Sequence, residues 1–253
     1  MIKKTLISLA ATTVLVAAPT LGFAEEAAPA ASPLSFNVGL VTDYRYRGIS
    51  QSRLQPALQG GADYAFASGS YVGTWLSTIK WIKDTPTAGS TPVEWDIYGG
   101  HKGELAKGLA YDVGGLYYAY VNNKYSNVGA NADTFEIYGA LTYGPVTAKY
   151  SHSVTNLFGN TDSKNSGYFE AAATFDLGGG WTVAPHIGYQ DVKGPAATDA
   201  TYTDYSLTVA KDFGGGLTGT LAVVGTDAKE SFYTLANKFN GKNGVVAGLK
   251  YGF

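Results

Sequence analysis

Several residue types that commonly stabilise or identify a protein are scarce in this sequence. The 253 residues include no cysteine, and only 15% of them are charged, against roughly 25% in an average soluble domain. The lack of cysteine excludes a disulfide framework and a cysteine-ligated metal site. Lys and Arg total 18 against 20 Asp and Glu, so no basic excess is present to engage nucleic-acid phosphates. We therefore expect neither a disulfide-stapled domain nor a nucleic-acid-binding protein.

A long apolar run is also absent. A shorter apolar run lies near the amino terminus. Two lysines precede an apolar stretch of 13 residues, 6–18, and small residues follow up to Ala24. This order predicts a secretory signal peptide, residues 1–24. The alternative is a transmembrane anchor, which needs about 20 apolar residues. We expect cleavage after Ala24 and a flexible leader rich in Ala and Pro over residues 25–33.

The remaining chain, residues 34–253, shows apolar residues that recur with a period of two. Phe135, Ile137 and Leu141, for example, alternate with Glu136 and Thr142. Such alternation predicts strands with one apolar and one polar face. Tyr and Trp stand near the ends of the apolar faces, as in the aromatic girdles of membrane barrels. Twelve strands are predicted, at about 36–46, 58–66, 71–81, 93–99, 109–121, 135–143, 146–152, 169–175, 181–189, 205–209, 217–223 and 245–253.

The connections between these predicted strands alternate between short and long. The short ones are 67–70, 103–108, 144–145, 178–180 and 214–216, and the long ones are 45–56, 82–92, 122–133, 154–167, 190–201 and 226–244. Tight turns at one end and long loops at the other are typical of outer-membrane barrels. A soluble β-sandwich, the alternative, does not gather its long loops at one end. The sequence therefore predicts an all-β fold, an antiparallel up-and-down transmembrane β-barrel of about 12 strands.

The polar faces of the predicted strands carry seven acidic and five basic side chains. Burying these charges in a dry core would cost severe desolvation, whereas a hydrated lumen tolerates them. Barrels of about 8 strands are filled by their own side chains, whereas those of about 16 to 18 strands enclose a channel. A barrel of 12 strands is therefore expected to have a narrow or nearly plugged lumen. The candidate pore-lining residues are Asp43, Arg45, Arg47, Asp63, Glu94, Asp96, Glu136, Lys149 and Glu170, and Lys102, Asp112 and Lys250 share their face.

All three arginines of the chain, Arg45, Arg47 and Arg53, lie within nine residues. Arg45 and Arg47 share the predicted inward face of the first strand with Asp43. Rigid bidentate donors in this position form an anion-attracting constriction in one hypothesis. In the other, which we favour, they form an ion-pair ladder with Asp63 or Glu94 on nearby strands. The two roles are compatible.

The first quarter of the mature chain resembles a known family. The runs GLVTDYRYRGISQS (39–52), QGGADY (59–64) and GSYVGTW (69–75) are similar to those of the TorF family of porin-like bacterial outer-membrane proteins. The specific match covers about residues 36–80. The resemblance implies a signal peptide, an outer-membrane barrel and a porin-like activity without a defined substrate. The carboxy-terminal Phe253, preceded by alternating apolar residues, is similar to the signal that the barrel-assembly machinery reads.

Enzymatic alternatives depend on three histidines, His101, His152 and His186. A lipid-hydrolysing barrel needs a Ser and a His close together on its outer face. His152 comes closest, but Ser151 and Ser153 belong to the opposite face of its strand. The sequence contains no HExxH motif and no EF-hand spacing. We therefore assign no catalytic residue, metal ligand or cofactor.

Together these patterns predict a porin-like channel in the outer membrane of a Gram-negative bacterium. It is expected to contact outer-membrane lipid and the barrel-assembly machinery, and to let small hydrophilic solutes diffuse passively through a narrow polar lumen. Two alternatives remain open. One is a barrel enzyme that hydrolyses lipid esters with His152 as its base. The other is a closed structural or surface-binding barrel whose function lies in the loop 226–244.

Overall fold

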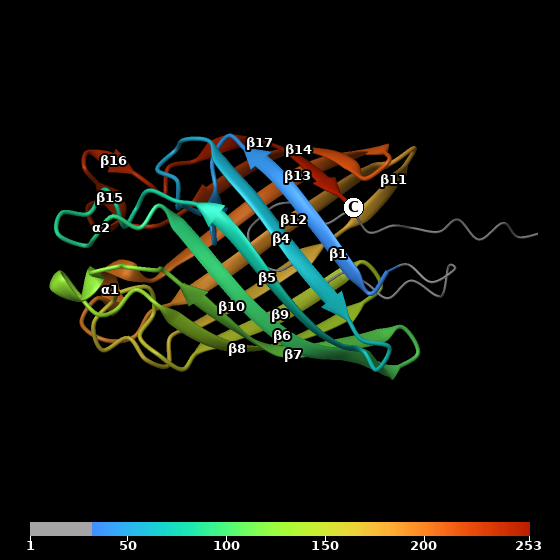
Figure 1. Cartoon of the computed structure of the whole chain (residues 1–253), viewed down its shortest axis with the longest axis horizontal. Coiled ribbons are helices and arrows are strands. Elements are labelled where there is room, and N and C mark those ends of the chain that lie inside the picture. Colours follow the sequence, from blue (N-terminus) through green and yellow to red (C-terminus); the bar gives the residue numbers. More distant parts are fainter. Residues whose placement is uncertain (1–31) are drawn as a thin grey trace, which may run out of the picture.

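The structure is a computed structural model that describes residues 32–253. The predicted signal peptide, residues 1–24, and most of the predicted leader lie outside the described residues. Antiparallel strands make up most of the regular structure (Figure 1). Short helical turns lie in the connections: η1 (Tyr125–Asn127), α1 (Ala197–Ala200) and α2 (Glu230–Tyr233). Within the described range, no helix combines the length and the hydropathy needed to cross a membrane.

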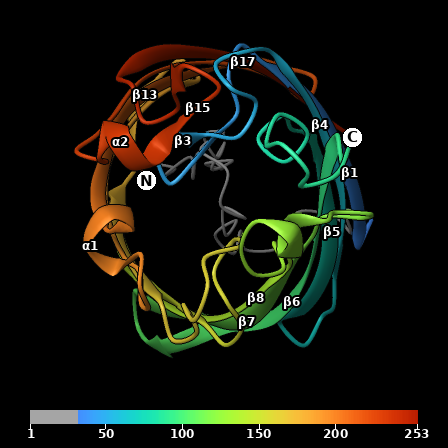
Figure 2. The ribbon, with the colours of Figure 1, turned by 90° about the vertical axis from the view of Figure 1, so that its left-hand side faces the viewer.

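The wall strands form one closed sheet, seen end-on in Figure 2. Successive wall strands pair antiparallel, and β1 (Leu34–Val41) closes the ring by pairing with β17 (Gly244–Gly252). Between them lie β4 (Ala57–Ala65), β5 (Ser70–Thr78), β6 (Val93–Ala106), β7 (Leu109–Ala119), β8 (Thr134–Tyr143), β9 (Val146–Ser153), β10 (Gly167–Ala173), β11 (Phe175–Gly178), β12 (Trp181–Asp191), β13 (Tyr202–Gly214) and β14 (Leu217–Thr226). Because β10 and β11 both pair with β12, they count as one wall strand. The predicted 12-stranded antiparallel barrel is thereby confirmed.

The two ends of the barrel differ in the length of their connections. Both described chain ends lie at the end with tight turns, where the Phe253 amide donates to the Phe36 carbonyl. The opposite end, on the left in Figure 1, carries the helical turns and the short hairpin of β15 (Thr234–Leu235) and β16 (Lys238–Phe239). The tight turns are 66–69, 107–108, 144–145, 179–180 and 215–216, and the long connections are 42–56, 79–92, 120–133, 154–166, 192–201 and 227–243.

Alternation along each strand separates an apolar outer surface from a polar interior. On β8, Ile137 and Leu141 are about half exposed, whereas Glu136 between Phe135 and Ile137 is only 2% exposed. Exposed apolar side chains recur on the outer face of every wall strand. A continuous apolar exterior of this kind is what a lipid-facing barrel surface requires.

Several tyrosines lie in the interior, in addition to those on the outer surface. Tyr118, Tyr138 and Tyr168 are each buried inside the barrel. Their rings need space on the neighbouring strand. A Cβ atom on Gly188, for instance, would overlap the Tyr168 hydroxyl. Glycine at this position therefore lets a large ring lie flat against the barrel wall.

Pro185 lies inside β12, where the sequence predicts a bulge because proline cannot donate to a strand ladder. The predicted bulge is wrong. β12 keeps one register with β13 through Pro185, which pairs with Leu207. On the other side, β10 ends at Ala173 and β11 begins at Phe175, with the same register before and after the gap. The missing N–H group therefore interrupts the ladder without inserting a residue.

Candidate functional site

The connection between β1 and β4, residues 42–56, folds back into the barrel. We call it the inserted segment. It contains a hairpin of β2 (Arg45–Tyr46) and β3 (Ile49–Ser50). Figure 2 shows β3 inside the ring of wall strands. Tyr44, Arg45, Tyr46 and Arg47 are all at most 8% exposed, so the segment fills part of the interior.

The tip of this hairpin is a two-residue turn formed by Arg47 and Gly48. Their φ angles are 46° and 77°, and positive φ at both central residues is the mark of a type I′ hairpin turn. The tip lies against the barrel wall, because a Cβ atom on Gly48 would come within 2.7 Å of Asp204 Cβ on β13. The hairpin therefore runs through the interior from β1 to β13, three strands further round the ring.

This arrangement corrects the prediction for the first strand, which the alternation extends to Tyr46. β1 ends at Val41, and both Tyr44 and Tyr46 are buried inside the barrel instead of facing outward. The physical reason is that β2 continues the period of two while its backbone has left the wall. Periodicity reports which residues alternate, and it does not report which sheet they belong to.

Two of the three arginines pair with carboxylates in the interior. Arg45 Nε lies 2.5 Å from Asp43 Oδ2 within the inserted segment. Arg47 forms a bidentate ion pair with Glu136 on β8, with N–O distances of 2.6 and 3.0 Å. It also donates a hydrogen bond to Gln190 Oε1 on β12 at 2.7 Å. Arg47 thus ties the hairpin tip to two separate wall strands. Fork-to-fork contacts of this type are among the strongest polar interactions in proteins.

The third arginine, Arg53, anchors the segment to two other long connections. Its guanidinium pairs with Asp84 and donates to the carbonyls of Leu235 and Ala236 at 2.9 and 3.3 Å. Both arginines of the predicted ladder are ion-paired, but their partners are Asp43 and Glu136. The proposed partners Asp63 and Glu94 bind tyrosine hydroxyls instead.

The remaining candidate residues lie on the interior faces of the wall strands. Asp63 accepts a hydrogen bond from Tyr98 at 2.5 Å, and Glu94 accepts one from Tyr120 at 2.5 Å and another from Tyr44. Lys149 and Glu170 face each other with 3.8 Å between Nζ and Oε1. The exposed fraction of Asp96 is only 6%, and its Oδ1 has no hydrogen-bond partner among the described residues.

Tyrosine–carboxyl pairs are a feature that the sequence analysis missed. Besides the contacts above, Tyr71 donates to Asp112 at 2.7 Å and Tyr168 donates to Asp204 at 2.9 Å. Asp204 was not among the candidate residues. Asp204 stands two residues before Ser206, which is on the polar face of the same strand. This spacing was the signal that could have placed Asp204 in the interior. These hydroxyls donate hydrogen bonds to acidic groups of the interior.

His186 completes a second interior cluster that was not predicted as a site. Its Nε2 lies 3.2 Å from Glu170 Oε2, and its Nδ1 lies 3.5 Å from Asp204 Oδ1. Both ring nitrogens therefore face carboxylates. Within residues 32–253, no group of three potential ligands has the geometry of a metal site.

Acidic groups outnumber basic groups in this interior. The carboxyls are Asp43, Asp63, Glu94, Asp96, Asp112, Glu136, Glu170 and Asp204, and the basic groups are Arg45, Arg47, Lys102, Lys149, His186 and Lys250. Arg45 and Arg47 are each neutralised by a carboxylate at close range. The interior is therefore expected to attract cations more than anions.

His152, the candidate base of the lipid-hydrolase alternative, lies on the outer face of β9. Its Nε2 is 3.3 Å from Asn165 Oδ1, and its Nδ1 is 3.4 Å from the Tyr150 hydroxyl. Ser151 and Ser153 are buried in the interior. Across the described residues, no serine is hydrogen-bonded to His152.

Comparisons with known proteins place the barrel among porin structures. A family described as "Bacterial protein of unknown function (Gcw_chp)" matches residues 25–253. No curated protein matches the sequence significantly. The KdgM porin aligns with a TM-score of 0.54 at 7% identity, covering 87% of this chain and 99% of that one. The NanC porin aligns with a TM-score of 0.53 at 10% identity, covering 87% and 97%. Similarity at such low identity concerns the fold alone.

Proposed function

The chain belongs to the Gcw_chp family of bacterial proteins, and we propose that it acts as a porin-like channel of the outer membrane. Small hydrophilic solutes diffuse passively through its narrow polar interior, and the protein performs no chemistry on them. The proposal is carried by one observation. The same strands present apolar side chains outside and a charged, hydrogen-bonded surface inside. A barrel with this distribution is suited to lie in lipid and to hold water within.

The orientation of the channel follows from the connections. Outer-membrane barrels turn tightly on the periplasmic side and carry their long loops outside the cell. The end of the barrel with the long connections, from which the inserted segment enters, therefore faces the exterior. A cleaved signal peptide over residues 1–24 and recognition of the Phe253 strand by the barrel-assembly machinery fit this route to the outer membrane. The resemblance of residues 36–80 to the TorF family of porins supports the same assignment.

The inserted segment provides the narrow part of the channel. It brings Tyr44, Tyr46 and Arg47 into the interior from the exterior end. The pore-lining surface consists of this segment together with Asp63, Glu94, Asp96, Glu136, Lys149 and Glu170. One structure similar to this chain is the KdgM porin in complex with disordered oligogalacturonate. The acidic interior found here disfavours polyanions, and we propose that the solutes of this channel are uncharged or cationic.

Solute uptake by liposomes that contain the refolded mature protein tests this proposal. We expect liposomes to swell in isotonic arabinose or glucose and to swell more slowly as the solute becomes larger. Protein that has been unfolded by boiling serves as the control. Folding is checked on gels, where an intact barrel migrates differently before and after boiling. Folded protein that gives no swelling with any small solute would contradict the channel.

A further inference from the structure

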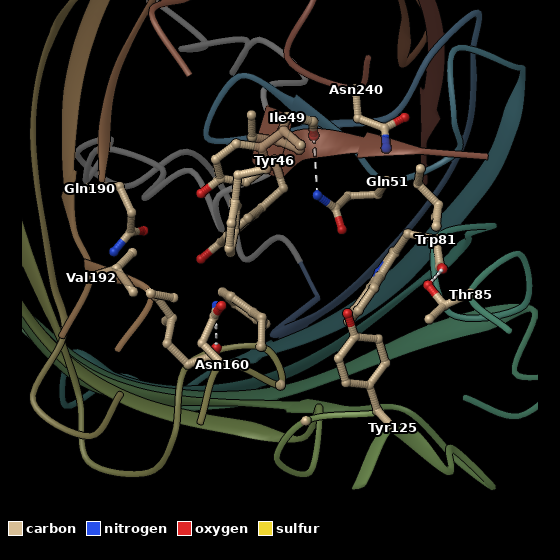
Figure 3. Close-up of a pocket in the computed structure, with 18 of the residues that line it drawn as sticks. Tyr46, Ile49, Gln51, Trp81, Thr85, Tyr125, Asn160, Gln190, Val192 and Asn240 are labelled. Carbon is tan, nitrogen blue, oxygen red and sulfur yellow. Dashed lines mark hydrogen bonds between the residues drawn. The ribbon is translucent and has the colours of Figure 1, made fainter. Parts of the chain in front are cut away.

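A cavity of about 510 Å³ lies at the long-loop end of the barrel, beside the inserted segment (Figure 3). Its volume falls within the range of about 300–1,000 Å³ that is usual for small-molecule sites. All six long connections contribute to its wall. Trp81, Thr85 and Tyr125 lie on one side in Figure 3, with Gln190 and Val192 on the other. Such convergence of separate loops forms a vestibule in front of the channel interior.

The lining of this vestibule contains no charged residue among those described. It combines aromatic rings with amide side chains. The rings are Tyr46, Trp81, Tyr125, Phe158, Tyr202, Phe232 and Tyr233, and the amides are Gln51, Asn160, Gln190 and Asn240. The three arginines of the inserted segment, Arg45, Arg47 and Arg53, are already paired with carboxylates. A charged ligand would therefore lose its hydration here without gaining a counter-charge.

Two polar atoms of the lining lack a partner within the described part of the chain. Asn240 is only 6% exposed, and its Oδ1 accepts no hydrogen bond. Trp81 Nε1 is a buried donor that has no acceptor. Gln51 lies between these two residues (Figure 3). Because buried polar atoms are rarely left unpaired, an acceptor and a donor on two residues of one cavity lining favour a ligand that can both donate and accept.

The aromatic rings are held in fixed positions by edge-to-face contacts. Trp81 packs at 5.3 Å from Tyr120 and 5.1 Å from Tyr125, and Tyr202 packs at 5.2 Å from Tyr233. Burial raises the pKa of the Tyr125 and Tyr233 phenols above their ordinary value. Both therefore line the cavity as neutral hydroxyl groups. The surface thus offers rigid apolar faces bordered by uncharged hydrogen-bonding groups.

We propose that this vestibule binds an uncharged saccharide. A sugar ring has an apolar C–H face for the aromatic rings and a rim of hydroxyls for the amides. Sugar hydroxyls both donate and accept, so different hydroxyls of one saccharide can donate to Asn240 Oδ1 and accept from Trp81 Nε1. The site deepens the proposed function by naming the solute class, and it rests on that function for its place at the channel mouth. Binding itself needs only the folded barrel.

Isothermal titration of the folded mature protein tests the site. The probes are the neutral trisaccharides maltotriose, cellotriose and raffinose, and the charged comparison is trigalacturonate. A detergent without a sugar head group keeps the cavity free. We expect at least one neutral trisaccharide to bind and trigalacturonate to bind at least tenfold more weakly. No binding of any neutral probe, or equal binding of the charged one, would overturn the proposal.

Two variants locate the binding. Trp81→Phe keeps an aromatic ring and removes the indole donor, and Asn240→Leu removes the acceptor and keeps the branched shape of the side chain. Each is expected to weaken binding about tenfold, which corresponds to about 1.4 kcal/mol. Trp95→Phe is the matched control, because its indole donates to Thr74 on the outer surface. Binding that is unchanged in both variants overturns the site. Swelling without binding contradicts this inference alone, whereas binding without swelling contradicts the channel alone.

Discussion

A chain in which a short Gly-Ser linker replaces residues 44–51 is expected to conduct ions several-fold better than the native chain. These residues hold the hairpin that crosses the interior, including the buried Tyr44, Tyr46 and Arg47. The strand pairing of the barrel wall does not depend on them, since Val41 and Ala57 already face each other as partners of β1 and β4. Removing the hairpin therefore widens the narrow part while the wall stays closed.

Single-channel recording in planar bilayers measures this effect. The shift in gel mobility on boiling shows whether the shortened chain still folds. Lys229→Ala provides a control on the loop surface, because Lys229 pairs with Asp199 and both side chains are about half exposed. Native-like conductance from a folded, shortened chain would mean that the inserted segment does not limit the path.

Replacing Arg47 by alanine is expected to reduce the free energy of unfolding by about 3–5 kcal/mol. The change leaves Glu136 buried without its ion-pair partner, and it also removes the contact with Gln190. The side chains of Arg47 and Glu136 are 6% and 3% exposed, so the pair is shielded from water in the native structure. The positive φ angle of 46° at position 47 strains alanine as much as arginine, because both residues carry a Cβ atom. It therefore does not contribute to the difference in stability.

Urea unfolding in detergent micelles measures this loss of stability. The double variant Arg47→Ala with Glu136→Gln is expected to recover part of it, because the buried charge is then absent. Lys229→Ala, which breaks an exposed pair, is expected to cost less than about 1 kcal/mol. Equal stability of Arg47→Ala and the native chain would show that the hairpin tip is not held by this pair.

The barrel could be predicted from the sequence because its two signals are local. Alternation over about ten residues sets the faces of a strand such as β8, and short connections such as 144–145 set the hairpins. The polar face of each strand likewise indicated interior residues such as Glu136 and Lys149. No long-range information was needed for any of these assignments.

The inserted segment could not be predicted, because its position depends on contacts between distant residues. The pairing of Arg47 with Glu136 joins positions 89 residues apart, and nothing near Arg47 indicates this partner. The space for the interior tyrosines depends on glycines of the neighbouring strand, as with Tyr168 and Gly188. The vestibule is formed by six connections at once, so no single motif encodes it.

Planar-bilayer recording of the native mature protein across a KCl gradient tests the central claim most directly. Stepwise openings would establish a channel, and the sign of the reversal potential reports which ion passes more easily. We predict stepwise openings with a preference for potassium, because the interior carries more carboxyl groups than basic groups. The absence of steps from protein shown to be folded would contradict the channel. A preference for chloride would contradict the claim that the acidic interior determines the ion selectivity of the channel.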